Sequence, residues 1–157
     1  MNYPKYFLDW PPSGKPDEIQ GVRAINIIAV KKAIELLQKF KKSTKNAEEL
    51  LRRLLKIEIV VQQSKQVLGL KYFAVGLTEA DKQKLTVGGA KGMSAFMSYY
   101  ILKAVASFDK ETAVAMMKEY YGAMLDKGAT TFWEDFDLDW ITNSCRIDKF
   151  PNRDQKD

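Results

Sequence analysis

Apolar residues at helical spacing constrain the fold of this chain more than any other feature of its sequence. Between residues 17 and 128, large apolar side chains recur at steps of three and four. This is the period of one face of an α-helix, whereas a half-buried strand would alternate at every second residue. The expected core face of the first helix consists of Val22, Ile25, Ala29, Ala33, Leu36 and Phe40. The periodicity therefore predicts a core built between helices.

Capping residues divide this stretch into shorter helices. Asn46 precedes an apolar run and has Glu49 three residues later, the arrangement of a capping box. Asp109 is also placed to cap a helix, and Gly76 and Gly128 stand where glycine commonly ends one. We therefore predict an all-α fold of antiparallel helical hairpins, with more than half of the residues helical. The expected helices cover residues 17–40, 46–57, 66–75, 78–85, 96–108 and 109–127.

One of these helices is apolar on all sides. The stretch from Phe96 to Phe108 contains a single charged residue among its large apolar side chains, Lys103. A helix of this composition must be covered on most of its surface by other parts of the protein. We therefore expect most sides of this helix to be buried.

The basic charge of the chain is concentrated in one hairpin. The net charge is +5, and between Lys31 and Lys56 nine basic residues stand against three glutamates. Such a hairpin could bind the phosphates of a nucleic acid. Nucleic-acid-binding surfaces often place aromatic residues among their lysines and arginines, however, and Phe40 is the only aromatic residue between Lys31 and Lys56. A solvated surface is the favoured interpretation, and nucleic acid is not an expected partner.

The absence of histidine limits the chemistry of the chain. Without it neither a Ser-His-Asp nor a Cys-His arrangement can form, and carboxylates are the candidates for proton transfer near neutral pH. The single cysteine, Cys145, excludes an intrachain disulfide and gives no indication of the redox compartment. No stretch approaches the ~20 apolar residues of a membrane span, and the first residues lack the apolar region of a signal peptide. We expect a soluble chain with no membrane partner, and its compartment is left open.

Residues 128–140, GATTFWEDFDLDW, combine four carboxylates with four large aromatic residues. The β-branched and aromatic residues predict an extended segment, in which alternation would place Phe132, Glu134 and Phe136 on one side. Glu134 would then lie beside aromatic rings, where desolvation raises the pKa of a carboxyl group. Such a group is a candidate general base. The acidic run lacks the glycine turn and terminal glutamate of an EF-hand loop, so no metal site is expected.

This segment, following a helix that ends in YYGAMLDKG, resembles bacterial α-L-rhamnosidases of glycoside hydrolase family 78. In that family it connects two helices of an (α/α)6-barrel. The stretches FLDWPPSGKPD, GVRA and GMSAFMSYYILKAV also occur in the order that the family shows. The likeness covers most of the chain, and it implies a partial (α/α)6 toroid.

The resemblance also implies roles for particular residues. Glu134 matches the glutamate of the family's G-x-T-T-x-W-E pattern, which acts as the general base of an inverting hydrolysis. Thr130 lies in the same motif. The implied partner is a rhamnose-containing carbohydrate, with no cofactor, and we expect both ends of the chain to open onto one cleft. The implied substrate-binding residues are Asp9, Trp10, Thr131 and Trp133.

The resemblance further implies that the chain is part of a larger enzyme. Residues 1–16 predict a docked loop, residues 17–128 helical hairpins, and residues 129–157 an active-site loop with a truncated tail. The family's general acid belongs to an earlier part of the barrel that has no match here. We therefore expect the chain alone to lack rhamnosidase activity, and to self-associate through apolar faces that the missing part of the barrel would cover.

Two alternatives stay open. The parent protein could be another (α/α)6-barrel enzyme that acts on a different carbohydrate, because a fold by itself does not fix the substrate. The second, less favoured alternative is a non-catalytic helical module that binds through its basic hairpin.

Overall fold

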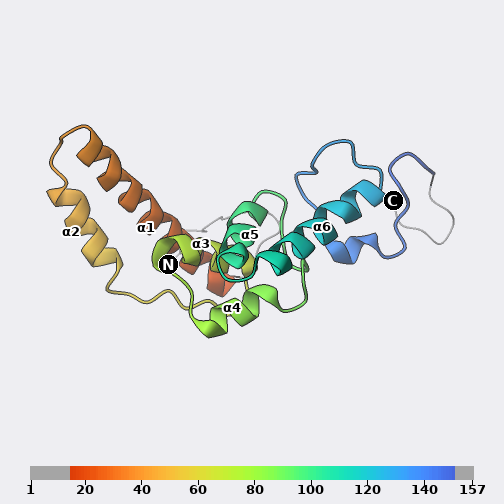
Figure 1. The fold of residues 1–157 in the computed structure, drawn as a ribbon, viewed down its shortest axis with the longest axis horizontal. Helices are drawn as coiled ribbons and strands as arrows, with labels where there is room; N and C mark the ends of the chain where they lie inside the picture. Colours follow the sequence, from red (N-terminus) through yellow and green to blue (C-terminus); the bar gives the residue numbers. More distant parts are fainter. Residues whose placement is uncertain (1–14, 151–157) are drawn as a thin grey trace, which may run out of the picture.

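The computed structural model of the protein describes residues 15–150 (Figure 1). More than half of these residues are helical and none lies in a β-strand, which confirms the all-α prediction. Within the same residues, no helix is both long and apolar enough to cross a bilayer. The helices are α1 (Lys15–Lys39), α2 (Lys45–Leu54), α3 (Lys65–Val75), α4 (Glu79–Thr86), α5 (Ser98–Ala106), α6 (Lys110–Asp126) and the short 3-10 helix η1 (Leu138–Ile141).

The helices pack one against the next along an elongated molecule. α2 packs on α1, α1 on α3, α3 on α5, and α5 on α6, while α4 contacts both α3 and α5. Figure 1 shows the α1–α2 hairpin at one end of the molecule and α6 with the C-terminal loops at the other. Each contact joins neighbours in this row, so the core is a series of helix–helix seams. The partial toroid stays a prediction.

Several helix ends lie where the sequence predicts them. The carboxylate of Asp109 accepts a hydrogen bond from the backbone of the first turn of α6. Thr78 and Asp81 form a reciprocal capping box at the start of α4. Gly76 caps the end of α3, and Gly128 follows the cap of α6 with a positive φ. These ends are predictable because each cap interacts within a few residues of its own position.

The predicted cap at Asn46 is wrong. α2 begins at Lys45, and its N-cap residue is Thr44. The hydroxyl of Thr44 donates to the carboxylate of Glu48 at 2.7 Å. Neighbouring polar residues can support the same helix start, so the sequence pattern alone did not distinguish the two registers.

The predicted core face of α1 is also wrong in part. Of its six positions, Val22 is half-buried, whereas the large side chains of Ile25, Leu36 and Phe40 are exposed. The fully buried stripe instead contains Ala24 and Ile27. Because α1 is apolar on two sides, periodicity identified a helix but not the side that faces α2 and α3. An apolar stripe on α1 is left uncovered within residues 15–150.

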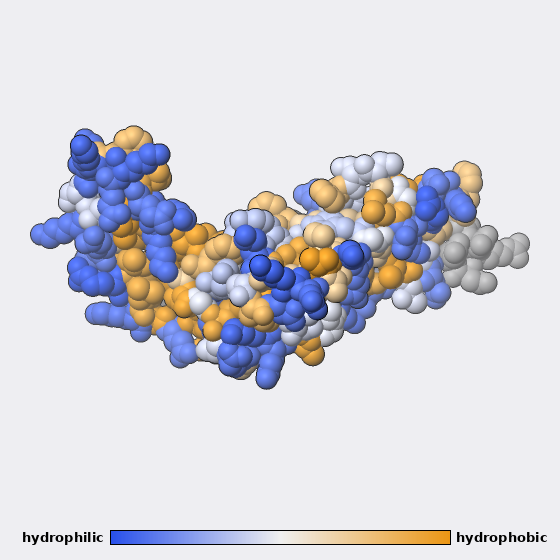
Figure 2. Space-filling view, in the orientation of Figure 1, coloured by the Kyte–Doolittle hydropathy of each residue, from blue (hydrophilic) through white to orange (hydrophobic). Residues whose placement is uncertain are grey.

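Helix α5 differs from its prediction in a similar way. Its inner side is buried, but Tyr99 is exposed, and Phe96, just before the helix, is 71% exposed. Figure 2 shows apolar surface along the α1–α2 hairpin and over the middle of the molecule, beside hydrophilic surface. The described part of the chain therefore does not cover its most apolar helix on all sides.

Helices α3 and α5 approach closely at Gly69. A Cβ atom at this position would lie 2.8 Å from the backbone nitrogen of Ile101 and 2.9 Å from the carbonyl carbon of Tyr100. Real side chains do not approach backbone atoms so closely, so only glycine permits this separation of the helix axes. The seam around it is formed by fully buried side chains, among them Leu68 and Ile101.

The segment between α2 and α3 is held by a buried carboxylate at the start of α1. Asp17 accepts hydrogen bonds from the backbone nitrogens of Gln62, Gln63 and Ser64 at 2.8–3.0 Å. Ser64 in turn caps α3 by accepting from the backbone of the helix. Asp17 is 2% exposed, and these three donors supply its buried carboxylate with hydrogen bonds.

A buried ion pair joins α3 to α4. Lys71 Nζ lies 2.7 Å from Asp81 Oδ2, and both side chains are almost fully buried. Burial favours the neutral carboxyl, but the hydrogen bonds from Lys71 and Thr78 outweigh it and hold the pKa of Asp81 below its ordinary value of 3.8. The carboxylate is therefore the favoured form throughout the neutral range.

We expect Gly69→Ala to lower the free energy of unfolding by about 1–3 kcal/mol, because the added methyl group forces α3 and α5 apart. Urea denaturation measures the change. Gly122→Ala is the matched control, since no atom beyond the neighbouring backbone of α6 lies within 4 Å of the position of its added Cβ. This second variant should be neutral or more stable by up to about 1 kcal/mol, owing to the higher helix propensity of alanine. Equal effects of the two variants would contradict the close approach at Gly69.

We expect Asp81→Asn to lower the free energy of unfolding by about 3 kcal/mol at pH 7, because the charge of Lys71 loses its buried partner. The pKa of Asp81 is lower in the folded chain than in the unfolded chain. Its ionised carboxylate therefore contributes fully to the free energy of unfolding at pH values above the unfolded pKa of 3.8. The difference between wild type and variant should then shrink as the pH falls through the folded pKa. Glu79→Gln removes an exposed pair on the same helix and should change stability by less than about 1 kcal/mol at every pH.

Candidate functional site

The candidate site begins at the C-terminal end of α6, where the helix closes in a Schellman motif. The backbone nitrogen of Ala129 donates to the carbonyl of Met124, and that of Gly128 donates to the carbonyl of Leu125. Gly128 has a φ of +92°, a conformation that side chains other than glycine rarely adopt. This turn directs the chain away from the helix axis into residues 129–137, which contain the predicted motif.

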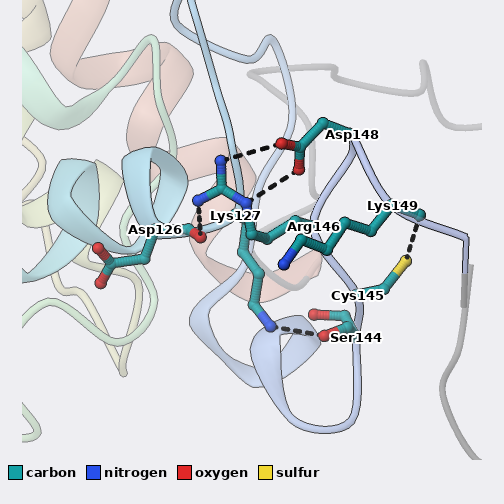
Figure 3. A network of polar contacts seen from close by, with 7 residues as sticks. All are labelled: Asp126, Lys127, Ser144, Cys145, Arg146, Asp148 and Lys149. Atoms are coloured by element: carbon teal, nitrogen blue, oxygen red, sulfur yellow. Dashed lines mark hydrogen bonds and ion pairs between the residues drawn. The ribbon is translucent and has the colours of Figure 1, made fainter. Parts of the chain in front are cut away.

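Polar contacts from the C-terminal segment hold this turn in place (Figure 3). Lys127 Nζ donates to the carbonyl of Ser144 at 2.6 Å, and the backbone nitrogen of Ile147 donates to the carbonyl of Lys127 at 2.9 Å. The Arg146 guanidinium donates to the carbonyl of Asp126 and pairs with Asp148. The end of α6 is thus covered by residues that follow the motif, and its last carbonyls have donors.

The other end of the motif is fixed to α6 through a buried ring. The hydroxyl of Tyr120 donates to the carbonyl of Phe136 at 2.7 Å, and the two rings meet edge to face. Trp133, half-buried, packs its ring against Phe136 with 5.4 Å between the centroids. Trp133, a predicted substrate-binding residue, therefore helps to anchor the loop.

The predicted alternation along this segment is wrong. Phe132 is 76% exposed whereas Phe136 is 3% exposed, although both were expected on one side. Residues 129–137 form bends and not a strand, because the described part of the chain has no neighbouring strand to align them. The hydrogen bond to Tyr120 turns Phe136 inward. The side of the loop on which a residue lies is set by these contacts with α6.

Glu134 lies on the exposed part of this loop. Its carboxylate forms no hydrogen bond or ion pair with any of residues 15–150. Thr131, from the same motif, is exposed as well. The structure thus brings Thr131, Trp133 and Glu134 together on one anchored loop, with the first and last of them accessible to solvent.

The aspartates that follow have structural partners. Asp137 caps η1 by accepting from the backbone nitrogen of Asp139, and Asp139 pairs with Lys91 at 2.9 Å. The hydrogen bond and charge of Asp139 raise the pKa of Lys91. Among the described residues, no group of three or more carboxylates, histidines or cysteines is placed to hold a metal ion. Asp137 and Asp139 thus serve the fold next to the loop.

The glycine-rich turn that carries Lys91 is itself fixed from two sides. The buried ammonium of Lys65 donates to the carbonyl of Gly89, and Glu119 accepts from the backbone nitrogen of Ala90 at 2.8 Å. Burial lowers the pKa of Lys65, and the nearby charge of Glu119 partly offsets this effect. These contacts are not predictable from the sequence, because each joins residues far apart in the chain and no motif relates them.

Asp9 and Trp10 lie outside the described residues. Their predicted role and the common cleft with Glu134 therefore stay predictions. Within residues 15–150, a cavity of about 270 Å³ lies beside the motif, although Glu134 is not one of its lining residues. Its walls are formed by Tyr121, Met124, Leu125, Ala129, Thr130, Thr131 and Phe132.

The basic hairpin uses part of its charge within the fold. Lys31 Nζ donates to the carbonyl of Ala74 at 2.6 Å and thereby ties α1 to the end of α3. Lys32 pairs with Glu35, and Arg52 pairs with Glu49. The alternative of a binding module that acts through this hairpin stays a prediction.

No family model, curated protein or solved structure matches this chain. The assignment to α-L-rhamnosidases therefore stays a prediction. It depends on the G-x-T-T-x-W-E pattern, which lies on the anchored loop.

We expect Tyr120→Phe to lower the free energy of unfolding by about 1–3 kcal/mol, because the carbonyl of Phe136 loses its buried donor. Amide hydrogen exchange of residues 129–137 should accelerate more than exchange in α3. Tyr99→Phe, which removes an exposed hydroxyl, is the control and should change stability by no more than about 0.5 kcal/mol. If the two variants unfold alike, the hydroxyl of Tyr120 does not anchor the loop.

Proposed function

We propose that this chain supplies the general base of an inverting α-L-rhamnosidase, and that the base is Glu134. The observation that carries the proposal is the accessible carboxylate of Glu134, which has no partner among residues 15–150. It stands at the last position of the motif, on a loop that is fixed at both ends. A general base must reach water and substrate, and it must be held in one geometry to act. The neighbouring Asp137 and Asp139 are less suited, since their carboxylates already hold η1 and Lys91.

In the proposed reaction, Glu134 takes a proton from a water molecule on the face of the sugar opposite the leaving group. The water oxygen bonds to the anomeric carbon as the bond from that carbon to the leaving oxygen breaks. A carboxylic acid, expected at ~6.5–9.5 Å from the base, protonates the leaving oxygen. Residues 15–150 offer no assigned candidate for this acid, so the proposal places it in another part of the enzyme.

The other motif residues take supporting roles in this proposal. Thr131 is exposed and can offer its hydroxyl to a sugar hydroxyl. Trp133 is half-buried against Phe136, so its main contribution is to keep the loop in position. Asp9 and Trp10 are proposed to complete the substrate cleft from a second loop, as the resemblance implies.

The uncovered apolar surface supports a larger parent enzyme. Leu36 on the outer stripe of α1 and Phe40 just after this helix are exposed, and so is Phe96 before α5. Monomeric proteins seldom leave contiguous apolar surface of this kind exposed. We propose that further helices of the barrel cover these faces, and that copies of the isolated chain associate through them.

In the enzyme that contains this chain, we expect Glu134→Gln to reduce kcat for an aryl α-L-rhamnoside by about 10² to 10⁴, because the amide cannot accept the proton from water. KM should change little, since ground-state contacts with the sugar persist. Steady-state kinetics on purified enzyme measure both quantities.

The matched control is Asp135→Asn, which removes the charge of the adjacent exposed carboxylate and should leave kcat within about twofold. Added azide should partly restore turnover in the Glu134→Gln variant only. Full turnover by that variant, or an equal loss in both, would exclude Glu134 as the base.

A further inference from the structure

A hollow of about 390 Å³ lies between α5 and α6, which pack against each other (Figure 1). We call it the α5–α6 groove. On the side of α5 it is lined by Tyr99, Leu102, Lys103 and Ala106. These positions follow the spacing i, i+3, i+4 and i+7, so they form one continuous stripe along the helix. The stripe covers two helical turns, or about 10 Å of the helix axis.

Helix α6 lines the groove with a second stripe of the same spacing, formed by Lys110, Ala113, Val114 and Met117. Ala113 is buried and Ala106 is half-buried, so small side chains form the floor. Val114 and Met117 are exposed and form a wall. Two apolar stripes that meet at a hollow are the arrangement that accommodates a third helix.

The aromatic edge of this groove is held in place. The ring of Tyr99 stacks on Phe73 of α3 with 6.3 Å between the centroids, and it meets Tyr100 edge to face. A side chain that is already fixed loses little conformational entropy when a partner binds. Met117 on the other wall is flexible and can adapt to the shape of a partner side chain.

Lysines surround the apolar part of the groove. Lys103 and Lys110 line it, and Lys110 also lines an adjacent hollow together with Lys118 and Glu111. None of the three ammonium groups forms a hydrogen bond or ion pair with any of residues 15–150. Lys110 lies in the first turn of α6, where the helix dipole disfavours a positive charge. With three lysines beside one glutamate, the rim is complementary to carboxylates.

We propose that the α5–α6 groove binds an amphipathic α-helix of a partner protein. Apolar side chains along one stripe of the partner helix pack on the two stripes of the groove. Aspartates or glutamates beside that stripe pair with the three lysines. The proposal does not depend on the rhamnosidase function, because it uses no residue of the motif loop.

The groove suits a separate acidic helix better than other occupants. A second copy of this chain would bring its exposed apolar stripe on α1, which belongs to the basic hairpin, against the lysines of the groove. A flat bilayer surface would leave the hollow between the helices unfilled. Leu36, Phe40 and Phe96, which are assigned above to contacts with the rest of the barrel, do not line this groove.

The test is a titration of a fluorescent peptide with the 157-residue chain, followed by fluorescence anisotropy. The peptide has about 18 residues, a length that supports a helix in water, with leucines along one stripe and glutamates beside them. We expect saturable binding. A matched peptide with lysines in place of the glutamates should bind about tenfold more weakly, because its charges repel the rim.

The triple variant Lys103→Gln, Lys110→Gln, Lys118→Gln removes the charges of the rim. It should weaken binding of the glutamate peptide about tenfold, since each exposed ion pair contributes only a small part of the affinity.

The matched control is the triple variant Lys39→Gln, Lys42→Gln, Lys45→Gln. It removes the same charge from exposed lysines of the α1–α2 hairpin and should leave the affinity within about twofold.

A second pair of variants tests the groove without changing a charge. Ala106→Leu places a larger side chain on the floor and should weaken binding about tenfold, because the partner helix is held away from both stripes. Ala33→Leu adds the same group to an exposed position of α1 and should leave the affinity within about twofold. Urea denaturation establishes that each variant is folded.

Three results would overturn the proposal. They are the absence of binding by the glutamate peptide, equal binding of the two peptides, and equal effects of the two triple variants. Binding to vesicles of phosphatidylcholine and phosphatidylserine, in place of the peptide, would assign the lysines to a lipid surface. Binding by the chain but not by the intact parent enzyme would show that another part of the parent covers the groove, and it would also exclude a separate partner.

The proposed catalytic role fails by a different result, full turnover by the Glu134→Gln enzyme. Peptide binding that depends on the groove lysines, together with such turnover, would keep the docking site and exclude the base.

Discussion

The close approach of α3 and α5 is the constraint on which the remaining packing depends. α3 contacts α1 on one side and α5 on the other, and α4 bridges α3 and α5. The missing side chain at Gly69 sets the distance between the two central helices. α6 then packs on α5, and the Schellman turn that begins the candidate loop follows from the end of α6. The position of the loop therefore depends on the α3–α5 contact and on the packing of α6 against α5.

The loop also shows how a short irregular segment can be fixed without a sheet. One end is held by backbone and side-chain donors from the residues that follow it, and the other by a tyrosine hydroxyl from the preceding helix. Phe132 and Glu134 are the exposed residues between these two contacts. One side chain is apolar and the other is charged, but both lie on the same anchored loop. Irregular segments on rigid scaffolds are common positions for binding and catalytic groups.

The sequence predicted the helices of this fold better than the sides that they bury. Caps such as Asp109 and Gly76 are local and were predicted, since each interacts within a few residues of its own position. The buried side of α1 depends on which apolar stripe meets α2 and α3, and spacing alone favoured Ile25 and Phe40 over Ala24 and Ile27. The sequence drew attention to the motif of the candidate site, because its residues are consecutive. The contacts of Tyr120 with Phe136 and of Lys91 with Asp139 could not be predicted, because they join distant residues that no local pattern relates.

The carboxylate of Asp17 has a consequence for how the molecule opens. α2 has no buried residue and packs mainly on α1 among the described helices, so we expect it to detach at a low free energy. The three hydrogen bonds to Asp17 hold Gln62, Gln63 and Ser64 on the far side of the connecting segment. Local unfolding of α2 can therefore stop at residue 61 and leave the cap of α3 intact. The buried carboxylate of Asp17 thus keeps the local unfolding of α2 from reaching α3 and its contact with α5.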